Sequence, residues 1–198
     1  MNVSKKTALV VVDLQKSLTT EAGNNYYPTA GEMMDRVAEN INKIRDKGAL
    51  IIYIWSKGHL SSGLTTAAPA INPDLEGRIM GPRTDEMLEL DDRLTIVPEK
   101  DILVCKHTYS AFWGTPLLEI LQQNGIENVV VCGIKTNICC RQTVVDSASH
   151  GFKTYIIRDM TSTNNDEIKA YHLAEMNKYF AKVLDAKEVL ERFDKKQF

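Results

Sequence analysis

The sequence has no long hydrophobic run and no excess of charge of one sign. None of its apolar stretches approaches the ~20 residues that a membrane span needs. Its 24 Lys and Arg residues stand against 26 Asp and Glu residues, a formal net charge of -2. Because this near balance gives no attraction for a polyanion, we expect neither nucleic acid nor a membrane as a partner.

An export signal is also lacking. Residues 1–15 contain two lysines and a short apolar run, but not the longer apolar core and small-residue cleavage site of a signal peptide. We therefore interpret Ala8–Val12 as a first strand. With no export signal, the expected location is cytoplasmic, where cysteines stay reduced.

Cysteine is scarce, and its spacing does not fit a structural metal site. The sequence has four cysteines, with no C-x-x-C pair and no histidine at zinc-finger spacing. This spacing argues against structural zinc. The sequence offers no sign of another metal or of a cofactor, and we predict none. Cys105 and Cys132 lie in apolar runs, where we expect small buried side chains. Cys139 and Cys140 are adjacent, and successive helix residues are rotated by about 100°, so both cannot face one cleft.

Repeats and low-complexity tracts are absent as well. A chain of 198 residues with 43% hydrophobic and 25% charged residues is ordinary for a globular protein. It is long enough to bury a core without a disulfide or metal to hold it together. We predict a single domain over residues 1–198, with its core at about 7–190.

Apolar strand patterns alternate with amphipathic helix patterns along the chain. Strands that are apolar throughout are typical of a parallel sheet covered on both faces. The sequence thus predicts a single Rossmann-like three-layer α/β domain with a six-stranded, mainly parallel sheet and helices on both faces. The predicted strands are 7–13, 49–55, 101–106, 127–133, 152–159 and 181–185, and the predicted helices are 31–48, 114–125, 136–151, 165–180 and 186–193.

Residues 56–83 depart from this alternation. They contain three prolines and several Gly and Ser residues, and the stretch is longer than a plain connection. We expect a loop near the cleft that serves binding, closure or subunit contact.

Three residues with chemical potential follow predicted strands. Asp13 comes after the first strand, Lys106 after the third, and Cys139 after the fourth, where we expect Thr136 to cap a helix. In parallel sheets ligands bind beyond the carboxyl ends of the strands. We therefore expect an acid, an ammonium and a thiol to converge on one cleft.

This trio is suited to nucleophilic catalysis. The helix start and Lys106 would lower the pKa of the Cys139 thiol, Asp13 could carry a proton, and first-turn amides could hold an oxyanion. Taken singly, each residue also has an ordinary explanation as a turn residue, a surface charge or a packing residue. Spacing alone does not decide between Cys139 and Cys140.

Two motifs make the sequence recognisable. They read K-x-x-x-S-A-F-x-G-T over 106–115 and G-I-K-T-N-I-C over 133–139, after the strand-end Asp13. Together with the order of elements, they resemble the isochorismatase-like cysteine hydrolase superfamily, which includes nicotinamidases and N-carbamoylsarcosine amidases. The resemblance extends from Thr7 to about Leu190.

The resemblance implies a role for each motif residue. It makes Cys139 the nucleophile, with Cys140 its neighbour, and it makes Asp13 and Lys106 the catalytic acid and lysine. It also implies a cis peptide bond between Ile134 and Lys135, which aims the Lys135 N–H, with that of Cys139, into an oxyanion hole.

Where this sequence departs from the family pattern, the differences indicate which substrates to expect. Nicotinamidases of this family carry a D-x-H…H metal motif after the second strand, whereas here His59 stands alone. The resemblance therefore argues against a metal and against nicotinamide. True isochorismatases have another residue at the nucleophile position, so Cys139 favours acyl transfer at an amide or carbamoyl group over vinyl ether cleavage.

Further residues are candidates for contact with a substrate. Gln15 would point the same way as Asp13 and could orient an amide. Aromatic rings near the cleft would suit a small planar substrate, although packing is an equal explanation for each of them. The predicted substrate-binding residues are Gln15, Trp55, Tyr109, Phe112 and Trp113, and His107 is a weaker candidate for a base.

The sequence thus predicts a cysteine hydrolase that cleaves the C–N bond of a small amide or carbamoyl compound through a thioester. The alternatives are isochorismatase-type ether hydrolysis and a catalytically silent binding or scaffold protein on the same fold. Relatives in this family commonly form dimers or tetramers, which the resemblance implies here as a homodimer or homotetramer.

Overall fold

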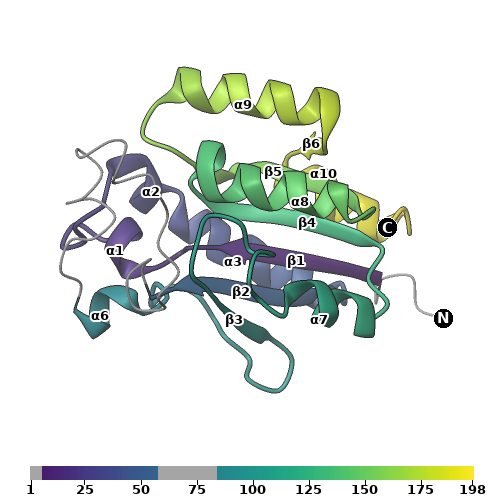
Figure 1. Cartoon of the computed structure of the whole chain (residues 1–198), viewed down its shortest axis with the longest axis horizontal. Helices are drawn as coiled ribbons and strands as arrows, with labels where there is room; N and C mark the ends of the chain where they lie inside the picture. The colour runs from purple at the N-terminus through teal and green to yellow at the C-terminus, as the bar shows by residue number, and fades with distance from the viewer. Residues whose placement is uncertain (1–5, 58–83) are drawn as a thin grey trace.

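A computed structural model describes residues 6–57 and 84–198 of the chain. These residues form one six-stranded sheet with strand order β3-β2-β1-β4-β5-β6 (Figure 1). All neighbouring strands pair in parallel, so the predicted fold class is confirmed. The strands are β1 (Thr7–Val12), β2 (Leu50–Ser56), β3 (Ile102–Lys106), β4 (Asn128–Ile134), β5 (Lys153–Ser162) and β6 (Lys182–Leu184).

The helices match the sequence pattern except in short pieces. The predicted helix 31–48 corresponds to the end of α2 and to α3, and the predicted helix 136–151 begins with a π-helical turn. Two further short helices, α1 and α6, have too few residues for a periodic pattern. The helical segments are α1 (Lys16–Thr19), α2 (Pro28–Glu32), α3 (Met34–Asp46), α6 (Asp85–Leu88), α7 (Leu117–Gln123), η3 (Thr136–Cys140), α8 (Arg141–Ser149), α9 (Asp166–Tyr179) and α10 (Ala186–Asp194).

Both faces of the sheet are covered by apolar side chains. On one face, alternate residues of the strands pack against α3 and α10. On the other face, the intervening residues pack against α7, α8 and α9. Val11 lies in the first cluster and its neighbours Val10 and Val12 lie in the second. This double burial explains why the strands read as continuous apolar runs.

The carboxyl ends of the strands lie at one edge of the sheet. The short helices α1, α2 and α6 gather at this end, on the left in Figure 1. Within the described ranges, no helix has the length and apolar character that crossing a membrane requires. The predicted loop 56–83 falls almost wholly outside the described residues, as does His59.

The pairing register of β4 and β5 shifts near their carboxyl ends. Val131 pairs with Ile156, but Gly133 pairs with Thr161, so β5 has extra residues between the two pairs. This irregularity extends β5 to Ser162, beyond the predicted end at 159, and places Thr161 beside the end of β4.

Gly133 of β4 pairs with Val12, the last residue of β1. Its φ is +119°, and a Cβ atom built there would lie 2.0 Å from the carbonyl oxygen of Val12. Val12 precedes Asp13, so this approach fixes the distance between the chain segments that carry Asp13 and Cys139. Only glycine fits this position without moving the backbone.

We predict that Gly133→Ala lowers the free energy of unfolding by at least about 3 kcal/mol, because both the φ and the contact with Val12 must change. Gly125→Ala is the control: Gly125 also has a positive φ of +62°, but a Cβ there would meet no atom within 4 Å. The control should cost only about 1–2 kcal/mol. Urea unfolding of the two variants measures both values, and equal costs would contradict the role of the close approach.

Candidate active site

Asp13 leaves β1 in an unusual backbone conformation. Its φ is +54°, in the left-handed region that few residues other than glycine adopt, although Asp tolerates it better than most. Its N–H donates a hydrogen bond of 3.0 Å to the carbonyl oxygen of Ile54, at the end of β2. The carboxylate is turned into the protein and is almost fully buried.

Lys106 lies between the other two residues of the trio. Its Nζ is 2.8 Å from Oδ2 of Asp13 and 3.4 Å from Sγ of Cys139, and it donates a 2.9 Å hydrogen bond to the carbonyl oxygen of Thr108. An ammonium has three protons, so these contacts account for all of them. The side chain is 3% exposed, which makes this a buried cation with a full set of partners.

Cys139, and not Cys140, faces this cluster. Both belong to η3, which follows directly after β4. Cys140 is fully buried in the core between the sheet and α8, where the Thr161 hydroxyl lies 3.8 Å from its sulfur. Cys139 is partly exposed and contacts Lys106. The structure therefore brings Asp13, Lys106 and Cys139 together, at the strand ends where the sequence placed them.

The expected lowering of the thiol pKa is wrong. Burial raises the pKa of Cys139 to about 12, Lys106 lowers it, and the negative charge of Asp13 raises it. The same neighbours have a matching effect on Lys106, whose pKa is raised by Asp13 and Cys139 against the effect of its burial. At neutral pH the thiol is therefore protonated, and Asp13 is the adjacent group that can accept its proton.

Asp13 has the free capacity to accept that proton. Its Oδ2 pairs with Lys106, but its Oδ1 is buried and accepts no hydrogen bond within the described part of the chain. Such an atom is costly to leave unpaired, which is typical of a functional group.

The peptide bond between Ile134 and Lys135 is cis, and it is the bond that the resemblance singles out. After it, the carbonyl oxygen of Lys135 accepts hydrogen bonds of 3.1 Å from the N–H groups of Ile138 and Cys140. The helix cap expected at Thr136 is wrong, because Lys135 occupies that position. The Thr136 hydroxyl instead lies 2.9 Å from the Thr161 hydroxyl.

Gln15 does not have its side chain available for a substrate. Its amide nitrogen donates to the carbonyl oxygens of Ser56 and Leu88, and its amide oxygen accepts from the N–H of Ser56. Both amide protons are thus used. The structure corrects its predicted role: Gln15 joins the end of β2 to α6.

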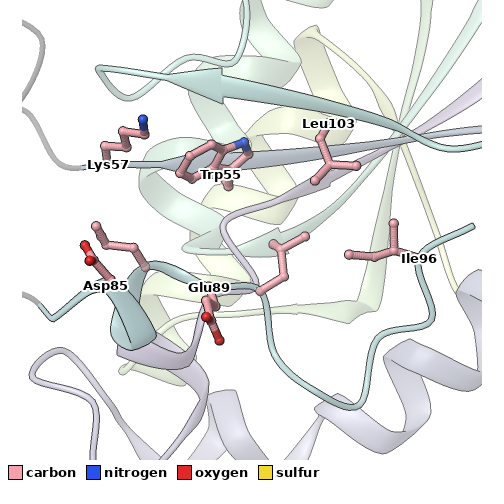
Figure 2. A pocket seen from close by; sticks show the side chains of 8 residues that line it. Trp55, Lys57, Asp85, Glu89, Ile96 and Leu103 are labelled. Atoms are coloured by element: carbon pink, nitrogen blue, oxygen red, sulfur yellow. The ribbon is translucent and has the colours of Figure 1, made fainter. Parts of the chain in front are cut away.

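Trp55 lies away from the trio. In the pairing of β2 with β3, Trp55 is opposite Cys105, so both side chains lie on the same face of the sheet. Val104 and Lys106, which flank Cys105, lie on the other face. The Trp55 ring lines a groove of about 530 Å³ (Figure 2). The residues that line this groove are Trp55, Lys57, Asp85, Leu88, Glu89, Leu90, Ile96 and Leu103. Asp13, Lys106 and Cys139 are not among them, so the predicted contact with a substrate is not supported.

The aromatic residues after β3 separate into two kinds. Phe112 is a core residue, with its ring 5.3 Å from that of His150 and 6.4 Å from that of Phe152, which corrects its predicted role in binding. Tyr109 is half-buried, and Trp113 is 55% exposed, so both remain candidates for contact with a substrate. His107 is half-buried beside Lys106.

Two groups at the site were not predicted from the sequence. The Thr108 carbonyl, which binds Lys106, is a backbone atom and leaves no sequence signal. The Thr143 hydroxyl donates a 2.8 Å hydrogen bond to the carbonyl oxygen of Cys139, and its position four residues later on the helix could have revealed this. Over residues 6–57 and 84–198, no group of three or more His, Cys, Asp or Glu side chains could hold a metal ion.

We predict that Asp13→Asn speeds the alkylation of Cys139 by iodoacetamide at pH 8, because this reagent reacts with the thiolate already present at equilibrium and needs no proton acceptor beside the sulfur. The substitution removes the charge that raises the thiol pKa and leaves Lys106 with the thiolate as its anionic partner. Since a lower pKa gives more thiolate but a weaker nucleophile, the rate should rise roughly threefold for each unit of the shift. Lys106→Met should slow the same reaction.

Peptide mapping of the alkylated protein measures Cys139 apart from the other thiols. Asp101→Asn is the matched control, because Asp101 is a buried carboxylate paired with Arg45 away from the trio. It should leave the rate unchanged. A slower reaction in Asp13→Asn would contradict the sign that we assign to the Asp13 charge.

Comparison with known proteins places this geometry in context. A maleamate amidohydrolase from Pseudomonas putida is 22% identical over 194 residues, which cover 95% of this chain and 87% of that protein. Nicotinamidase 3 from Arabidopsis thaliana is 27% identical over 197 residues, which cover 92% of this chain and 86% of that protein.

Solved structures share the fold. An N-carbamoylsarcosine amidase from Thermoplasma acidophilum has a TM-score of 0.73 at 27% identity, covering 91% of this chain and 96% of that one. A cysteine hydrolase from Pseudomonas syringae pv. phaseolicola has a TM-score of 0.86 at 22% identity, covering 98% of this chain and 94% of that one. The family model of the isochorismatase domain matches residues 7–188. The chain therefore belongs to the isochorismatase family.

Proposed function

We propose that this protein is a cysteine amidohydrolase that cleaves the C–N bond of a small, non-peptide amide or carbamoyl compound. The observation that carries the proposal is the position of Lys106, 2.8 Å from the Asp13 carboxylate and 3.4 Å from the Cys139 sulfur. The amidohydrolases among the relatives support the same class of reaction.

In the first step, the Cys139 sulfur attacks the carbonyl carbon of the substrate, and the thiol proton moves to Asp13. This proton transfer makes the thiolate more stable in two ways. A protonated Asp13 no longer repels the thiolate, and the fixed charge of Lys106 then stabilises it. The high pKa of the resting thiol is thus compatible with nucleophilic attack, because deprotonation and attack are coupled.

The attack places a negative charge on the former carbonyl oxygen. We assign its stabilisation to the N–H groups of Lys135 and Cys139, which border the cis peptide bond and the start of η3. Asp13 then gives its proton to the leaving nitrogen, the C–N bond breaks, and a thioester on Cys139 remains.

In the second half of the reaction, water replaces the departed ammonia or amine. Asp13, again ionised, takes a proton from that water while its oxygen attacks the thioester carbon. The C–S bond breaks, Asp13 returns that proton to the departing sulfur, and the acid product leaves. Asp13 thus acts as base, acid, base and acid in turn, and the resting state is restored.

The thiol at position 139 favours acyl transfer over ether hydrolysis, since a thiol forms a covalent acyl intermediate readily. Tyr109 and Trp113 are the aromatic residues that we still assign to substrate contact. A cytoplasmic location and a homodimer or homotetramer remain expectations from the sequence, and sedimentation of the purified protein tests the second.

We predict that Cys139→Ala lowers kcat for ammonia release by at least ~10³-fold, because the nucleophile is lost. Cys140→Ala is the matched control on the adjacent residue, and it should keep kcat within about threefold. A panel of small amides and carbamoyl compounds, scored by ammonia release, identifies the substrate for this comparison. Activity that persists in Cys139→Ala but disappears in Cys140→Ala would refute the assignment of the nucleophile.

We also expect the reaction to need no metal ion. The proton transfers and charge stabilisation above use only protein groups, and His59 lacks the partners of a metal motif. Dialysis against EDTA should leave kcat within about twofold. A loss of activity that added Zn²⁺ restores would show that a metal takes part.

A further inference from the structure

A single buried hydroxyl connects the backbone of Cys139 to the segment that follows β3. The Thr143 side chain, fully buried on α8, donates a hydrogen bond of 2.8 Å to the carbonyl oxygen of Cys139. The Thr143 hydroxyl oxygen in turn accepts a hydrogen bond of 3.1 Å from the N–H of Ala111. The hydroxyl thus donates to one segment and accepts from another that is 32 residues away in the sequence.

A second contact holds the same segment against α8. The Ser110 hydroxyl lies 2.5 Å from Oδ2 of Asp146, and it accepts a hydrogen bond of 3.2 Å from the N–H of Phe112. Ser110 is 7% exposed. Ser110 and Ala111 belong to the S-A-F part of the first motif, so this part of the motif serves to attach the segment to the helix.

The attached segment also reaches the catalytic lysine. Thr108, three residues before Ala111, supplies the carbonyl oxygen that accepts a hydrogen bond from Lys106. The contacts thus form a closed path around the thiol, from the Cys139 carbonyl through Thr143, Ala111, Thr108 and Lys106 to the Cys139 sulfur.

From this closed path we infer that Thr143 is a positioning residue, which sets Lys106 and the Cys139 sulfur in register for attack through the segment 108–111. The inference rests on the function proposed above. The Thr143 hydroxyl donates to the Cys139 carbonyl and accepts from the Ala111 N–H, so it acts through backbone groups.

We expect loss of the Thr143 hydroxyl to lower the rate of the chemical step and to leave substrate binding nearly unchanged. The Asp13–Lys106 ion pair remains when the Thr143 hydroxyl is removed, so the cleft keeps its charges. The Ala111 N–H loses its acceptor and the segment shifts, which moves the Thr108 carbonyl and tilts Lys106 away from the sulfur. Misalignment of reacting groups lowers the rate of the chemical step more than it lowers binding.

The test uses 4-nitrophenyl acetate as an acyl donor, with the whole chain. In this reaction the Cys139 sulfur bonds to the acetyl carbon, the C–O bond breaks, 4-nitrophenolate leaves, and the thiol proton passes to Asp13. We expect Thr143→Val to lower the saturating acylation rate by roughly 10- to 100-fold while the half-saturating concentration stays within about twofold. Thr143→Ser, which keeps the hydroxyl, should recover most of the rate.

Thr154→Val is the matched control. Thr154 is a buried threonine of β5. Its hydroxyl lies 2.8 Å from that of Ser147, which belongs to α8, the helix that also carries Thr143. It should lose comparable stability in urea unfolding but keep the acylation rate within about twofold. An unchanged rate in Thr143→Val, or an equal loss in Thr154→Val, would overturn the positioning role.

If Thr143→Val does not fold, Ser110→Ala removes the second attachment and should lower the acylation rate severalfold; an unchanged rate would refute the inference. Failure of the proposed function gives a different result. In that case the wild-type protein would show no acetyl group on Cys139 by mass spectrometry, or would hydrolyse no amide, whatever the rate in the Thr143 variants.

Discussion

The site depends on one buried ammonium. Lys106 must hold a charge away from water, and it does so because the Asp13 carboxylate, the Cys139 sulfur and the Thr108 carbonyl oxygen surround it. A buried cation without such partners would lose its proton or destabilise the fold. The same contacts pair a proton acceptor with a nucleophile, so the arrangement that satisfies Lys106 also assembles the chemistry.

The fold provides these partners from three parallel strands. β1, β3 and β4 end at the same edge of the sheet: Asp13 follows β1, Lys106 is the last residue of β3, and Cys139 lies in η3, the helical turn after β4. Gly133 lets β4 approach β1 beside Asp13, while the positive φ of Asp13 turns its carboxylate into the protein. Local backbone strain at Asp13 is thus compensated by the rigid strands on either side.

The strands could be predicted because apolar runs reveal parallel strands, and the convergence of an acid, an ammonium and a thiol because strand ends share one edge. The choice of Cys139 over Cys140 came from the family resemblance, since spacing alone left it open. The sign of the Cys139 pKa shift could not be predicted, because it depends on burial by several elements. The side of the sheet on which Trp55 lies could not be predicted, because a strand buried on both faces shows no alternation of apolar and polar residues. The role of Gln15 was hidden because its partner Leu88 is 73 residues away in the sequence. Short helices and the irregular step in β5 arise from tertiary contacts.

The central claim is that the empty enzyme holds Cys139 as a thiol, and that its proton moves to Asp13 only when the sulfur attacks the substrate. Infrared difference spectroscopy of the wild-type protein against Cys139→Ala tests it most directly, because the S–H stretching band of this one thiol survives the subtraction. We expect that band at neutral pH in the empty enzyme, and its loss after acylation by 4-nitrophenyl acetate. Absence of the band in the empty enzyme would show a resting thiolate and would contradict the claim.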